Sequence, residues 1–187
     1  LGQGLTRMGH PCRPACSFSM PVAGFFGGVL PPFRCLFSTL CFPAPMARIV
    51  FDLPAHFGFA TEMQIYISHV NQGGHLDNAQ LLTLVSEARL RFFTWLSYFE
   101  SDVEGTNIVV GDIVAQYKSE GFHGETMRIE MAPTDFNKYG FDLQFRMSDK
   151  ATGREVALGK IGIVFVTRTN RKVALIPAAF MTRLRQL

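Results

Sequence analysis

Hydrophobic and polar residues alternate from Met63 to Val70, with Met63, Ile65 and Ile67 on one side. A period of two predicts a β-strand. The next segment, Asn71 to His75, contains two adjacent glycines, which supply backbone angles that other residues resist and so predict a turn.

After this turn the apolar period changes to three and four, which predicts a long helix with one buried side. Asp77 or Asn78 can cap its start, because short polar side chains accept hydrogen bonds from the free N–H groups there. We expect the helix to run to about Tyr98. Its apolar positions are Leu81, Leu84, Val85, Ala88, Phe92, Trp95, Leu96 and Phe99.

Four β-rich runs follow, and turn-forming residues separate them. Their order predicts consecutive hairpins in an antiparallel meander. The last run is nearly all apolar, which indicates a central or interface strand. Pro177 is expected to end a short strand and to open a C-terminal helix over 178–186. The four runs cover residues 107–119, 125–132, 139–147 and 154–167.

A strand, one long helix and a series of antiparallel strands predict an α+β protein. Only a single sheet wrapped around the helix can bury the helix's apolar side, and this is the hotdog arrangement. Such a sheet has two open edges, and pairing through an edge removes that liability. We therefore expect a homodimer or a homotetramer.

Charge and cysteine divide the chain at Met46. No Asp or Glu occurs before Asp52, so residues 46–187 hold all 15 acids and 15 of the 18 basic residues. This near-neutral segment gives no support for nucleic-acid binding. All four cysteines precede Met46, so the segment has no cysteine nucleophile or disulfide, and no complete zinc ligand set is present.

Residues 1–45 contain seven of the ten prolines and no regular apolar period. We expect an unstructured leader, either spurious upstream translation before Met46 or a targeting segment. No stretch reaches the roughly 20 apolar residues of a transmembrane span. A soluble, cytoplasmic protein is therefore expected, with its folded domain at 46–187.

Three features form a recognisable pattern at the helix: Gly74-His75, then Asn78, then Glu87-Ala88-Arg89. The pattern resembles the hydroxybenzoyl-CoA thioesterase group of the hotdog superfamily. This resemblance implies hydrolysis of an acyl-CoA to free acid and coenzyme A, without a cofactor or a metal. One position departs from it, since many members carry an aspartate where this chain has Asn71.

Thioester hydrolysis needs one group that polarises the carbonyl and another that activates water. The helix start at Asn78 offers free N–H groups and a positive dipole end to a developing oxyanion, and Gly74 lets a substrate approach the backbone. Alternatively, the two glycines only form the turn. His75 either donates to the carbonyl or holds the turn through its ring nitrogens. Asp77 is expected to lie in the substrate-binding region and to cap the helix rather than to react.

The amide of Asn71 is neither a base nor a nucleophile at neutral pH. The resemblance therefore favours Glu87 as general base, with Asn71 orienting water or the carbonyl. The alternative for Glu87 is a salt bridge with Arg91 or a solvated position. Arg168 and Lys172 belong to a basic cluster that either contacts the coenzyme A phosphates or forms a solvated turn.

Two other functions stay open. The first is a hotdog dehydratase acting on a hydroxyacyl thioester, because some of these enzymes pair a His before the helix with a Glu within it. The second is a non-catalytic hotdog domain that binds an acyl thioester, which Asn71 in place of the acid would explain.

Overall fold

A computed structural model describes residue 49 and residues 52–186. The predicted leader, residues 1–45, lies outside these residues. A short 3₁₀ helix, Ile67–His69, follows the first strand. The other elements are β1 (Phe59–Gln64), α1 (Asn78–Trp95), β2 (Thr106–Tyr117), β3 (Thr126–Thr134), β4 (Gly140–Asp149), β5 (Glu155–Thr167) and α2 (Ala178–Leu184).

The five strands form one antiparallel sheet in the order β1-β3-β4-β5-β2. The predicted meander is correct only for β3, β4 and β5. β2 does not pair with β3, which follows it in the chain; it lies at the far edge and pairs with β5, Tyr117 facing Ala157 and Thr106 facing Thr167. The nearly apolar β5 is therefore a central strand, as predicted.

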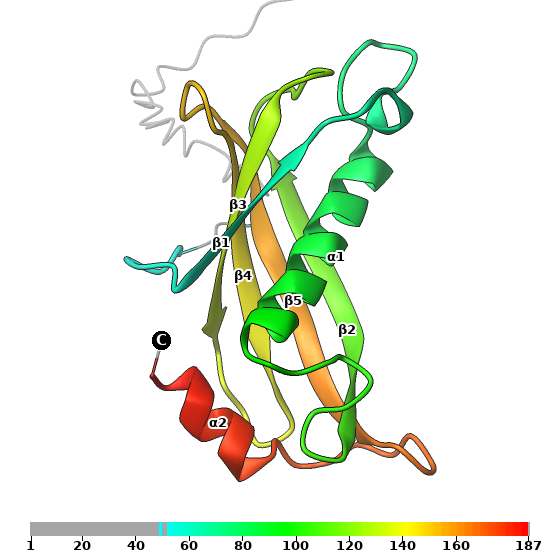
Figure 1. Cartoon of the computed structure of the whole chain (residues 1–187), viewed down its shortest axis with the longest axis vertical. Coiled ribbons are helices and arrows are strands. Elements are labelled where there is room, and N and C mark those ends of the chain that lie inside the picture. Colours follow the sequence, from blue (N-terminus) through cyan, green and yellow to red (C-terminus); the bar gives the residue numbers. More distant parts are fainter. Residues whose placement is uncertain (1–48, 50–51, 187) are drawn as a thin grey trace, which may run out of the picture. The chain divides into compact units, whose positions relative to one another are not determined.

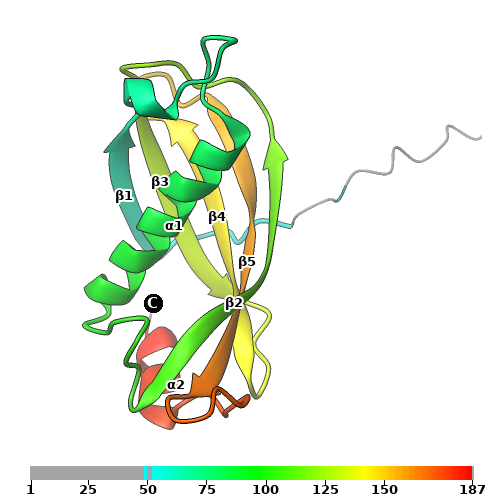
Figure 2. The same ribbon diagram turned by 90° about the vertical axis from the view of Figure 1, so that its right-hand side faces the viewer.

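Helix α1 lies along one face of the sheet, and the sheet curves around it (Figures 1 and 2). This arrangement confirms the predicted α+β hotdog fold. The core between helix and sheet includes the fully buried Phe92 and Phe93 of α1 and Phe145 of β4. Burying such large apolar side chains is the main source of stability for the fold.

The predicted apolar side of α1 is correct through most of its length. Trp95 and Phe99 are exceptions, because both are exposed. Trp95 still packs against Phe59 of β1, with ring centroids 5.5 Å apart. The helix ends at Trp95 rather than Tyr98, since Ser97 has a φ of 66° and cannot continue it.

Two predictions about strands were wrong. The strand expected over 63–70 begins earlier and ends at Gln64, because the Tyr66 carbonyl accepts from the His69 N–H at 2.9 Å and turns the chain. Ile67 is left 72% exposed. The strand expected before Pro177 is reduced to a single bridge between Val166 and Val173.

Helix α2 closes the end of the core that lies away from the start of α1. Its Phe180 is fully buried and stacks on Phe93, with ring centroids 5.8 Å apart. It also contacts Tyr98 and Phe165 edge-on. Among the described residues, no helix has the length and apolar character needed to cross a membrane.

Candidate active site

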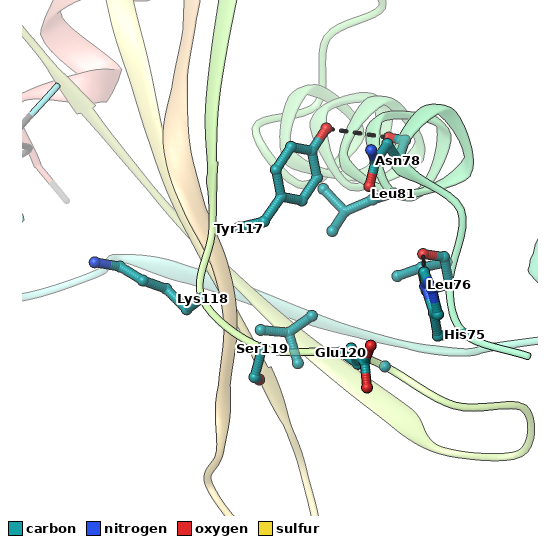
Figure 3. A pocket seen from close by; sticks show the side chains of 10 residues that line it. His75, Leu76, Asn78, Leu81, Tyr117, Lys118, Ser119 and Glu120 are labelled. Atoms are coloured by element: carbon teal, nitrogen blue, oxygen red, sulfur yellow. Dashed lines mark hydrogen bonds between the residues drawn. The ribbon is translucent and has the colours of Figure 1, made fainter. Parts of the chain in front are cut away.

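A cavity of about 220 Å³ lies beside the first turn of α1. One wall consists of His75, Leu76, Asn78 and Leu81, and the other includes residues 117–120 (Figure 3). Gly121 and Val156 of β5 also line the cavity. We call this cavity the helix-start pocket. Its two walls come from segments about forty residues apart in the chain.

Backbone hydrogen bonds hold the two walls together. The Leu76 N–H donates to the Gly121 carbonyl at 2.8 Å, and His75 forms a β-bridge with Phe122. These contacts exist because β2 ends at Tyr117, and the chain must then pass the start of α1 to reach β3. The unexpected topology of β2 therefore builds the pocket.

The turn before α1 fixes the His75 ring. Asn71 Oδ1 accepts from the Gly73 N–H at 2.8 Å, and Asn71 Nδ2 lies 3.4 Å from His75 Nδ1. Gly73 lies against the ring, since a Cβ there would stand 2.9 Å from His75 Nε2. Gly74 has a φ of 82°, which favours glycine for the turn itself. This backbone angle supports the alternative that Gly74 is needed to form the turn.

Asp77 caps α1, as predicted. Its Oδ1 accepts from the N–H groups of Ala79 at 2.8 Å and Gln80 at 3.4 Å. The N–H of Asn78 has no acceptor among the described residues. Because unpaired N–H groups at a helix start carry partial positive charge, this end of α1 suits a developing negative charge.

The opposite wall is polar, and sequence reasoning missed it. The Tyr117 hydroxyl lies 3.4 Å from the Asn78 carbonyl, and Ser119 Oγ donates to the Glu155 carbonyl at 2.6 Å. The Lys118 side chain extends away from His75, whereas Glu120 lies across the pocket from it (Figure 3). The only sequence signal was a polar run, Gln116 to Glu120, at the end of an apolar strand.

Glu87 lies in a different cavity, on the other side of α1. This cavity of about 370 Å³ is lined by Glu87 and Arg91 of α1, by β1 and by the 3₁₀ segment with His69, and we call it the β1-side pocket. Arg91 Nε donates to Glu87 Oε1 at 2.8 Å, and both side chains are nearly half exposed. This is the salt bridge that the sequence left as the alternative. Within one chain, Glu87 and His75 do not share a pocket.

The loop that follows β5 and contains Arg168 and Lys172 lies at the opposite end of the sheet from the start of α1 (Figure 1). Arg168 is exposed and pairs with Asp102 at 3.2 Å. A strand rises by about 3.3 Å per residue, so roughly 40 Å of strand separates Val156 from Arg168. The structure therefore does not bring these two cations near His75 within one chain.

Comparison with known proteins settles the family. Residues 66–184 match the model of the thioesterase-like superfamily. The chain belongs to the thioesterase-like superfamily. The match spans both walls of the helix-start pocket and confirms the prediction of a thioesterase. No curated protein matches the sequence.

Solved structures share the fold of this superfamily member at low sequence identity. A 1,4-dihydroxy-2-naphthoyl-CoA thioesterase from Synechocystis is 17% identical with a TM-score of 0.64, the match covering 69% of this chain and 96% of the other. A DHNA-CoA thioesterase from Staphylococcus aureus is 15% identical with a TM-score of 0.62, covering 68% and 88%. A Staphylococcus aureus protein in complex with CoA is 13% identical with a TM-score of 0.64, covering 73% and 87%.

Proposed function

We propose that this thioesterase hydrolyses acyl-CoA to a free acid and coenzyme A at the helix-start pocket. The observation that carries the proposal is the meeting of His75 with the unpaired Asn78 N–H in one cavity. Both groups suit the oxygen of a thioester carbonyl, which gains negative charge as the carbonyl carbon is attacked. Coenzyme A enters as part of the substrate, and the proposed reaction uses no other cofactor and no metal.

His75 and Asn71 act as a unit in this proposal. His75 Nδ1 lies 3.4 Å from both Asn71 Nδ2 and the Leu76 carbonyl oxygen. In the tautomer used by this proposal, the Asn71 amide donates to Nδ1 and the neutral ring carries its proton on Nε2. That N–H and the Asn78 N–H polarise the carbonyl. Gly74 sets the turn, and Asp77 holds the first turn of the helix so that the Asn78 N–H stays available.

The substrate's phosphates need cations near the pocket mouth, and we assign Lys118 to this position. It is exposed, lines the helix-start pocket and forms no ion pair within the part of the chain that the structure describes. Arg168 and Lys172 reach a phosphate only if a second copy of the chain brings them there. Their contact with coenzyme A stays a prediction, as does the cytoplasmic location.

A second copy of the chain would pair through β2. This strand is the longer of the two sheet edges and exposes Val110 and Ile113. An unpaired edge with apolar side chains favours association. The homo-oligomer expected from the sequence is therefore proposed to form here, and light scattering of the purified full chain measures its mass.

The test is incubation of the full chain with a panel of acyl-CoAs and a thiol-reactive dye. Release of free thiol together with free acid supports the proposal. Binding without turnover would instead identify a non-catalytic acyl-thioester-binding protein. Formation of an enoyl product from a hydroxyacyl-CoA, without thiol release, would identify a dehydratase.

A further inference from the structure

Glu120 is the one carboxylate among the residues that line the helix-start pocket. It faces His75 from the opposite wall (Figure 3). Its carboxylate oxygens form no hydrogen bond or ion pair with any other described residue. Glu120 is exposed at the edge of the cavity, so its carboxylate is free to bind a proton or a water molecule.

The backbone of Glu120 is held firmly although its side chain is free. Arg154 donates to the Glu120 carbonyl from Nη1, and its Nη2 bridges both carboxylate oxygens of Glu125 at 2.7 and 2.8 Å. The next residue, Gly121, accepts the hydrogen bond from Leu76. The Arg154 charge is thus paired with Glu125, and the backbone that carries the Glu120 side chain is held in place. Such positioning on a rigid support is what a catalytic group requires.

The other acidic or amide groups near the start of α1 have structural tasks. Asp77 caps the helix, Asn71 cannot accept a proton at neutral pH, and Glu87 is bound by Arg91 in the β1-side pocket. A general base must lie within hydrogen-bond reach of the water that it activates, directly or through one water molecule. Of these groups, only Glu120 is a carboxylate in the same cavity as His75.

We propose that Glu120 is the general base of the thioesterase, a role that rests on the hydrolysis proposed above. Glu120 takes a proton from water as the water oxygen bonds to the thioester carbonyl carbon. The tetrahedral oxyanion is held by His75 and the Asn78 N–H. The carbon–sulfur bond then breaks, the coenzyme A sulfur takes the proton from Glu120, and the free acid leaves. The overall reaction consumes one water molecule and regenerates the carboxylate.

The test compares Glu120→Gln with the wild-type full chain on an acyl-CoA that the wild type hydrolyses. Gln keeps the shape but cannot accept the proton, so kcat should fall on the order of 10²- to 10⁴-fold, with KM changed little. Glu104→Gln is the matched control. Glu104 is exposed at the other end of the sheet, and its Oε1 accepts from the Tyr98 hydroxyl at 2.7 Å, a bond that the amide oxygen of Gln can also accept. This variant therefore makes the same chemical change away from the pocket.

Formate rescue separates a base from a residue that only shapes the pocket. Added formate should restore part of kcat in Glu120→Ala, because a small carboxylate can fill the vacated space, and should not stimulate Glu104→Ala. Thermal unfolding of each variant gives the folded fraction used to normalise the rates. Glu120→Gln with wild-type kcat would overturn the proposal, and so would a loss confined to KM. A wild type without thioesterase turnover refutes the proposed function instead.

Discussion

The two pockets beside α1 contain similar side chains but use them differently. In the β1-side pocket, Glu87 and Arg91 neutralise each other, and Arg91 also donates to the Thr61 hydroxyl and the Glu62 carbonyl, each at 3.1 Å. In the helix-start pocket, the Glu120 carboxylate and the Asn78 N–H have no partner among the described residues. Paired charges fix one side of the helix to β1, whereas unpaired groups leave the other side ready for a ligand.

The difference between the two pockets also bears on which carboxylate can act as a general base. A base bound to a guanidinium must first lose that partner or share it, since hydrogen bonds to the charged form favour that form. As a general base, Glu87 would have to release or share Arg91, whereas Glu120 has no such partner to release. Measuring Glu87→Gln beside Glu120→Gln decides between them, and the larger loss of kcat is expected for Glu120→Gln.

Gly73→Ala should cause the largest loss among the remaining variants. The new Cβ would stand 2.9 Å from His75 Nε2 and 3.1 Å from Asn71 Oδ1, so the ring must shift. A displacement of about 1 Å at a catalytic group can cost about 100-fold in rate. We expect kcat to fall by about that factor. The neighbouring exposed residue gives the control, Gln72→Ala. Equal rates for the two variants would mean that the position of the ring is unimportant.

Lys118→Ala should raise KM for an acyl-CoA about tenfold, because one phosphate contact is worth roughly 1.4 kcal/mol. An acyl thioester of pantetheine lacks the nucleotide phosphates, and its KM should not change. Initial rates on the two substrates measure the difference. A larger effect from Lys172→Ala would show instead that the phosphates lie against the other end of a neighbouring chain.

The sequence was sufficient to predict α1, because its apolar period and the Asp77 cap are local signals. It also indicated the fold, since one helix among many strands has few ways to bury its apolar side. The residues after β2 could not be identified in this way. Tyr117 and Glu120 line a cavity beside the start of α1 only because β2 crosses to the far edge of the sheet, and no local sequence pattern shows which strands pair.

Glu87 illustrates a second limit of sequence reasoning. It is adjacent to the buried Ala88 and three residues from the buried Leu84, so the helical period places it at the border of the apolar side. The period does not say which of the two flanking pockets such a residue enters. The pocket that Glu87 enters depends on where β1 packs and on which groups Arg91 can contact, and both are set by the tertiary structure.

Asp77→Ala tests the support of the helix-start pocket through stability. The variant loses the acceptor for the Ala79 and Gln80 N–H groups, and an N-cap of this kind contributes about 1 kcal/mol. Urea denaturation should show a decrease of that size in the free energy of unfolding. Asp77→Asn, which keeps an acceptor oxygen, should lose less. Similar losses in the two variants would mean that the charge, rather than the hydrogen bonds, stabilises the helix.

The smallest effect is expected on the β1 side, where the Glu87–Arg91 bridge spans one helical turn. Both side chains are nearly half exposed, with 46% and 44% of their area accessible, so solvent screens the attraction. Pairs of this type contribute about 0.3–0.5 kcal/mol. Arg91→Gln should lower the free energy of unfolding by about that amount, and high salt should remove most of the difference. A loss above 1 kcal/mol that persists in salt would show that Arg91 stabilises the β1 side mainly through its hydrogen bonds to Thr61 and Glu62. The contrast between paired charges in the β1-side pocket and unpaired groups in the helix-start pocket would then weaken.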